Sequence, residues 1–164
     1  MPVVSSGSHV FVQFPEWNAE GVFDKLNDKE TANMQDRISK LVLLLATREL
    51  AQKTRQETQV VINSVAPGLC HSNLCRNARG EAAKAIEDRK AKYARTTEEG
   101  SRTLVHAVTV GWEANGRYLN DCEVQDNALS NFVRSEDGQK AQKKIWTELE
   151  ERLEAIEPGI IGLV

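Results

Sequence analysis

The pattern of hydrophobic and polar positions divides the chain into alternating strands and helices. A β-branched run at Val3 to Ser6 stops at serines and Gly7, which predicts a strand that ends in a turn. A second run, Gln59 to Gly68, is apolar on successive residues and ends at a Pro-Gly pair. Such runs are typical of parallel strands that are covered on both faces. Gly116 to Asp121 is predicted to be a third, short strand.

Helical spacing of apolar residues marks the segments between these strands. Thr31 to Lys53 carries an apolar stripe, and its middle, LVLLLA, is apolar almost all round, which predicts burial on two sides. Glu81 to Tyr93 is a charged, Ala-rich helix. The TTEE of Thr96 to Glu99 has the form of a capping box and predicts the start of another helix. Lys143 to Ile156 reads as a last helix, closed by a Pro-Gly pair.

This order of strands and helices predicts the fold class. Alternating strand and helix favours an α/β domain with a partial, Rossmann-like parallel sheet of about three strands and flanking helices. The length of 164 residues fits one domain, residues 1–164. Phe14 to Lys29 shows no sustained period, so we expect a long loop that holds about one helical turn.

Composition and charge exclude several classes of partner. The 21 Lys and Arg residues are interspersed with 24 Asp and Glu residues, for a net charge of −3. A nucleic-acid footprint needs a basic surplus or stripe, so no nucleic-acid partner is expected. The longest apolar run, Leu41 to Ala46, is too short to cross a bilayer, and no leader pattern precedes the first strand. We therefore expect a cytoplasmic protein without a membrane partner.

The three cysteines form an odd number without a disulfide pattern, which favours a reduced, intracellular chain. Cys70, His71 and Cys75 carry candidate metal donors. No second pair of donors follows at a plausible spacing, however, and His9 and His106 are isolated. We expect no metal site.

Several segments together carry a family resemblance. A serine turn is followed by a helix with SKL and ATREL, then by INSVAPG, TTEEGSRTLVHA and GRYLNDCE. In this order they resemble the C-terminal half of a short-chain dehydrogenase/reductase, and most of all the fungal, retinol-dehydrogenase-like branch. Each motif alone is weak, but their order is specific, and the similarity covers essentially the whole chain.

The resemblance implies that part of the family's fold is absent. The strand at Val3 to Ser6 resembles the fifth of seven strands in a Rossmann sheet, and the Gly-rich turn that holds the dinucleotide pyrophosphate would precede it. The expectation is a single truncated domain that lacks the dinucleotide-binding half and uses no cofactor. A gene-model artefact, with a true start further upstream, would also explain this.

The resemblance also implies site residues. The family places a serine after the fifth strand and a Tyr-x-x-x-Lys pair on the next helix, whose phenol transfers the proton that accompanies hydride transfer. Ser6 matches the serine and Lys40 the lysine, but Asp36 stands where the tyrosine belongs. Neither of the two tyrosines, Tyr93 and Tyr118, has a lysine four residues later. An aspartate is not a proton donor near neutral pH, so hydride transfer is disfavoured.

Each candidate has a catalytic and a structural interpretation. Ser6 is either a hydrogen-bond donor to a substrate carbonyl or a cap at the strand end. Lys40 either binds a polar group in a pocket or lies at the surface. Asp36 is either a new acid/base group or an ion-pair partner of Lys40. His9 is either a general base near Ser6 or an ordinary loop residue.

Two further segments are candidates for substrate binding. By resemblance, the loop of Pro67, Gly68 and Leu69 lies over the substrate; otherwise it is an ordinary strand exit. Phe14 and Trp17 either form another wall of the pocket or cover the core.

These observations leave three functions open. The first is a cofactor-independent isomerase, cyclase or lyase for a small hydrophobic substrate in fungal secondary metabolism. The second is a non-catalytic pseudoenzyme or accessory binding subunit. The third is a residual NAD(P)-dependent oxidoreductase with a site assembled between chains. A sheet that ends at its fifth strand would expose an edge, which favours a homodimer.

Overall fold

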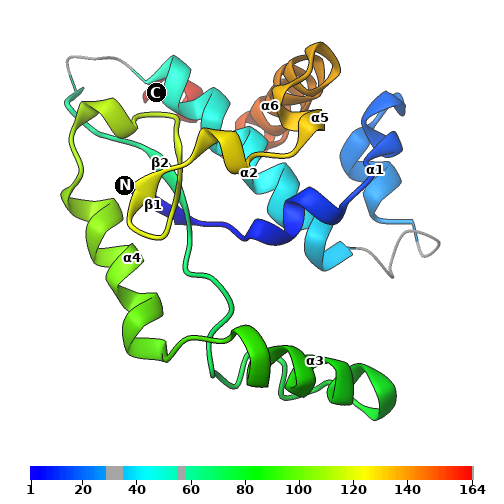
Figure 1. Ribbon diagram of the computed structural model, residues 1–164. Coiled ribbons are helices and arrows are strands. Elements are labelled where there is room, and N and C mark those ends of the chain that lie inside the picture. Colours follow the sequence, from blue (N-terminus) through cyan, green and yellow to red (C-terminus); the bar gives the residue numbers. More distant parts are fainter. Residues whose placement is uncertain (29–34, 55–57, 164) are drawn as a thin grey trace.

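The computed structural model describes residues 1–28, 35–54 and 58–163, with the side chains of residues 35 and 36 outside that description. Its centre is one sheet with the strand order β1-β2-β3-β4 (Figure 1). The strands are β1 (Pro2–Val4), β2 (Asn63–Ala66), β3 (Tyr118–Asn120) and β4 (Glu123–Val124). β1, β2 and β3 run parallel to one another, and β4 is antiparallel to β3. The α/β class is confirmed.

A fourth, antiparallel strand extends the three parallel strands that the sequence predicts. Asp121 and Cys122 connect β3 to β4 with φ angles of 52° and 59°, which places both central residues of a two-residue hairpin in the left-handed region. Asn-Gly or Asp-Gly usually marks such turns, and the Asp-Cys pair does not carry that signal. The sequence pattern therefore missed β4.

Two long helices stack on one face of the sheet. The helix α2 (Gln35–Lys53) packs against both the sheet and α6 (Glu136–Ile156) (Figure 1). The predicted burial on two sides is confirmed, because the leucines at the middle of α2 are fully buried: Leu41, Leu44 and Leu45. The last helix begins seven residues earlier than predicted, since Ser135 caps it through the backbone N–H of Gly138 (3.1 Å). The first turn of α6 is polar, so the apolar stripe that predicts this helix begins only later.

The opposite face of the sheet is covered by α4 (Thr97–Thr109), whose Ala107 packs with Val65 and Leu119. The predicted capping box is present. Thr96 Oγ1 accepts from the backbone N–H of Glu99 (3.1 Å), and the Glu99 carboxylate accepts from the backbone N–H of Thr96 (2.8 Å).

The remaining elements are short or peripheral. Helix α3 (Gly80–Tyr93) has no buried residue and stands away from the sheet (Figure 1). The predicted loop at 14–29 contains two short helices rather than one turn. The short elements are η1 (Gly7–Phe11), η2 (Pro15–Asn18), α1 (Val22–Leu26), η5 (Trp112–Ala114), η6 (Asp126–Ala128), α5 (Asn131–Arg134) and η7 (Ile160–Leu163). Within the described ranges, no helix combines the length and apolar character that crossing a bilayer requires.

Candidate functional site

Ser6 lies where β1 ends. The backbone N–H of Ser5 donates to Val65 O (2.8 Å) and continues the ladder one residue beyond the strand. Ser6 Oγ then accepts from the backbone N–H of Ser8 (3.1 Å) and caps η1. The structural interpretation of Ser6 as a cap is thus present in the fold. A capping hydroxyl uses a lone pair, so its proton stays available to a bound molecule.

Lys40 is held at the same end of the sheet. Its ammonium donates to Val4 O (3.2 Å), and Ser5 Oγ donates to the Lys40 carbonyl (3.3 Å). These two bonds join α2 to the end of β1 and bring the ammonium beside the serine turn. The ion pair of Lys40 with Asp36 stays a prediction, because the Asp36 side chain lies outside the described residues.

His9 is a buried residue of η1 and not an exposed loop residue. Its ring donates from Nδ1 to Ser6 O (2.7 Å) and meets the Tyr118 ring edge to face, with centroids 5.3 Å apart. Its Nε2 has no hydrogen-bond partner in the described part of the chain. Burial lowers the pKa of His9, although the bond to Ser6 opposes this, so the imidazole is neutral at neutral pH. The neutral imidazole thus holds the serine turn in place through its bond to Ser6 O.

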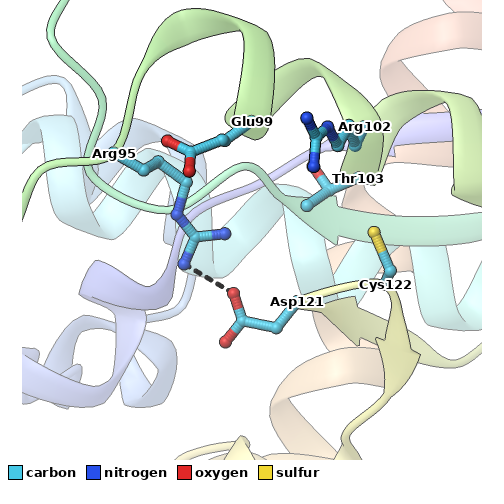
Figure 2. A pocket seen from close by; sticks show the side chains of 6 residues that line it. All are labelled: Arg95, Glu99, Arg102, Thr103, Asp121 and Cys122. Atoms are coloured by element: carbon cyan, nitrogen blue, oxygen red, sulfur yellow. Dashed lines mark hydrogen bonds and ion pairs between the residues drawn. The ribbon is translucent and has the colours of Figure 1, made fainter.

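The loop after β2 reaches the same edge of the sheet, because β1 and β2 are parallel. Gly68 has a φ of 75°, and a Cβ there would meet the Arg95 guanidinium carbon at 2.9 Å. Arg95 therefore lies directly on the Pro67-Gly68 exit, and its backbone N–H donates to Leu69 O (2.9 Å). Its guanidinium also pairs with Asp121 (2.6 Å) at the tip of the β3–β4 hairpin, as Figure 2 shows.

This pair borders a hollow of about 260 Å³ (Figure 2). Its lining consists of Arg95, Glu99, Arg102, Thr103, Asp121 and Cys122. The charges in it are compensated by neighbours. The hydrogen bond that Arg95 donates to Asp121 raises the pKa of Arg95, and the bonds that Arg102 donates to Glu98 raise the pKa of Arg102. Hydrogen bonds that Thr96 donates to the Glu99 carboxylate lower the pKa of Glu99. All three groups stay charged at neutral pH.

Arg95 and Asp121 border this hollow but were not candidates from the sequence. A signal for Asp121 existed, since it is a polar residue at the end of a predicted strand, and strand ends form the ligand-binding edge of a parallel sheet. Arg95 carries no such signal, because its place depends on the absence of a Cβ at Gly68.

Phe14 and Trp17 lie elsewhere. Phe14 is a core residue whose ring packs edge to face on Phe132, and the Trp17 ring also contacts Phe132. The structure thus brings together Ser6, Lys40 and the turn that contains His9, with Pro67, Gly68 and Leu69 at the neighbouring strand end. A substrate-binding role for the two aromatic residues stays a prediction.

The residues present do not on their own fit a whole dinucleotide. Ser6 and Lys40 match the residues that the family places near the reacting end of the cofactor, but the sequence contains no G-x-x-x-G-x-G or G-x-G-x-x-G turn for a pyrophosphate. In the described ranges no three His, Cys, Asp or Glu side chains gather into a metal-binding group.

Comparison with known proteins reveals relatives in fungi. No protein-family model and no solved structure matches the chain. A short-chain dehydrogenase of Penicillium roqueforti is 41% identical over 96% of this chain and 43% of its own length. A short-chain dehydrogenase/reductase of a Cryptosporiopsis species is 40% identical, over 96% of this chain and 49% of its own. A short-chain dehydrogenase of Emericella nidulans is 42% identical over 73% of this chain.

The first two likenesses cover nearly all of this chain and the third covers about three quarters, and each covers less than half of the relative. The similarity agrees with the α/β sheet and with the order of the motifs along it. The chain is therefore a relative of the fungal short-chain dehydrogenases/reductases that spans about half of their length.

Proposed function

We propose that the chain catalyses a proton transfer without hydride, as an isomerase, cyclase or lyase on a small hydrophobic carbonyl compound. One observation carries the proposal: the Ser6 turn and the Lys40 ammonium are fixed at the same end of β1. A hydroxyl and an ammonium beside one substrate oxygen would stabilise the negative charge that develops when a neighbouring C–H bond is broken.

At the position where the family has its phenol, this chain has a side chain that can accept a proton rather than donate one. Asp36 stands one helical turn before Lys40, and a carboxylate is ionised at neutral pH. In the proposed step the carboxylate takes the proton from the carbon next to the carbonyl, and the bond electrons move to the oxygen held by Ser6 and Lys40. Return of the proton to another carbon completes an isomerisation, and loss of a leaving group completes an elimination.

The two tyrosines supply no replacement for the missing phenol. Tyr93 is exposed on α3. Tyr118 is buried, and burial with the nearby Asp121 charge raises its pKa to about 12. A phenol with this pKa stays protonated at neutral pH. Neither tyrosine has the lysine four residues later that accompanies the family's phenol. We propose secondary metabolism as the setting, because the three relatives compared above come from fungi.

Exchange of deuterium into a simple ketone tests this directly. We expect the chain to accelerate exchange at the carbon next to the carbonyl of 2-octanone in D₂O, followed by NMR. Ser6→Ala, Lys40→Met and Asp36→Asn should each slow the exchange about tenfold or more, since each removes a group that acts in the step. Lys92→Met, an exposed lysine on α3, is the control and should change nothing. Equal rates in all four variants would contradict the proposed site.

A second candidate rests on the relatives, whose names describe them as dehydrogenases. In this alternative, the dinucleotide site is completed by another chain. Titration with NADH and NADPH by calorimetry separates the two. Micromolar binding of about one cofactor per chain would favour the oxidoreductase function over the proposed one. A folded protein with neither cofactor binding nor ketone exchange would be a binding or accessory subunit.

We also propose that a second copy of the chain covers the open edge of β1. Within the described residues, β1 is hydrogen-bonded to a strand on one side only, and Val4 keeps 45% of its surface exposed. Unpaired strand edges recruit other chains unless they are blocked. A homodimer is the simplest way to cover this edge.

A further inference from the structure

A second hollow lies at the opposite end of the sheet from Ser6. It has a volume of about 520 Å³ and is bordered by α2, α6, α5 and the segment after β4. Arg48 on its wall donates to Gly116 O (3.4 Å), just before β3 begins, which places the hollow at the amino ends of the parallel strands. Along α2, Arg48 is eight residues or about 12 Å from Lys40. The hollow is therefore separate from the site proposed above.

Three cations border this hollow without carboxylate partners. Arg48, Arg134 and Lys143 take part in no ion pair among the residues that the structure describes. Asp126 also lines it, but its carboxylate is already engaged by Arg117 and by the backbone N–H of Tyr118 (2.9 Å). Such a group of one sign is notable in a chain whose net charge is −3, because it concentrates anions locally.

The arginine on the wall is oriented by a buried chain of hydrogen bonds. Arg48 Nε donates to Gln142 Oε1 (3.4 Å), and Gln142 Nε2 donates to Glu49 Oε2 (2.7 Å). Gln142 is 7% exposed and cannot turn without losing its bond to Glu49. The guanidinium is therefore fixed on one side to Gln142 and Gly116, and its Nη2 makes no hydrogen bond to the residues that the structure describes. On the rim, the Arg134 side chain donates to the neutral Oδ1 of Asn131 (2.7 Å), its one hydrogen bond within the described ranges.

The wall of the hollow is mainly polar, with a small apolar area at its base. Leu129 and Val133, both 4% exposed, belong to the hydrophobic core under the cations. A charged wall with a small apolar area suits a molecule with an anionic head and a short apolar part. The volume lies within the roughly 300–1,000 Å³ of ordinary small-molecule sites. An arginine fork accepts carboxylate and phosphate equally well, so the head belongs to that shared class.

We propose that this hollow binds a small amphipathic anion, a carboxylate or a phosphate monoester with a short hydrocarbon chain, through Arg48, Arg134 and Lys143. Octanoate and octyl phosphate, below their micelle concentrations, are the probes, and octanol is the uncharged match. We expect saturable binding of at least one anion at one per chain by calorimetry, with a shift of the Gln142 side-chain amide in NMR spectra. The tighter probe identifies the head group.

Charge-neutral variants locate the site. Arg134→Gln and Lys143→Gln should each lower the affinity for the anion about tenfold, the loss expected for one charge-assisted contact. Lys140→Gln removes the same charge from the same helix, but Lys140 pairs with Asp137 and should leave the affinity unchanged. Circular dichroism confirms that each variant is folded. The proposal is overturned by absence of saturable binding of both anions, by octanol binding as tightly, or by an equal loss in Lys140→Gln.

Discussion

At the scale of single residues, His9 shows how one side chain supports the site without touching a substrate. Its ring is fully buried under the serine turn, where it donates to Ser6 O and contacts Tyr118. Its Nε2 has no partner in the described residues, so a proton added there would be a buried charge without compensation. Protonation of His9 should therefore destabilise the turn that presents Ser6.

This predicts a pH dependence of stability. The folded pKa of His9 is lowered below its ordinary value of 6.5, so the unfolded chain takes up this proton first as the pH falls. The free energy of unfolding should therefore fall as the pH drops below about 6.5, by at most about 1.4 kcal/mol per pH unit. The facing Tyr118 phenol, with a pKa of about 12, stays neutral throughout. Urea unfolding at several pH values measures the slope.

His9→Gln should flatten this slope, because an amide can still donate to Ser6 O but does not titrate. His71→Gln is the matched control, since His71 is exposed on a loop and its loss should leave the slope unchanged. If a folded His9→Gln protein keeps the full slope, another group is its source.

At the scale of elements, the bend between α5 and α6 determines how the last helix meets the core. Ser135 caps α6, and Gly138 in its first turn lies against the backbone of Phe132 in α5. A Cβ at Gly138 would overlap the Phe132 carbonyl, which is backbone and cannot rotate away. The close approach brings Phe132 toward Phe14 and Trp17. One glycine thus determines where these rings pack.

Gly138→Ala should lower the free energy of unfolding by about 2 kcal/mol, the usual cost of overpacking, despite the better helix propensity of alanine. Gly162→Ala is the control, because a Cβ there would have no heavy atom within 4 Å. Its effect should stay within about 0.5 kcal/mol. Urea denaturation of both variants gives the comparison, and equal stabilities would show that α5 and α6 can separate at little cost.

At the scale of the whole molecule, the sequence predicts the order of the main elements and names candidate site residues. The three parallel strands, the burial of α2 and the capping box of α4 depend on local patterns, and all three are present. Ser6 and Lys40 are candidates because each lies in a recognisable motif, and their roles stay predictions. The hairpin at Asp121, the Arg95 contact and the burial of His9 depend on residues far apart in sequence, which no local pattern records.

The proposed dimer is tested on the same scale. Light scattering should give twice the mass of one chain. Val4→Glu places a charge on the open edge of β1 and should yield monomers, since like charges would face each other across paired edges. Val124→Glu places the same charge on β4, where the edge is only two residues long, and should leave the dimer intact. A wild-type protein that runs as a stable monomer would contradict the dimer.

The shortness of β4 has a consequence for solubility. It has two residues, both exposed, and one of them is the carboxylate of Glu123, so that side of the sheet offers almost no ladder to an incoming strand. In the proposed dimer, two chains that join along β1 would leave each other no further long edge. Polymerisation into fibrils needs two adhesive sides on every unit. A sheet with only one long open edge can pair with one other sheet and cannot extend further.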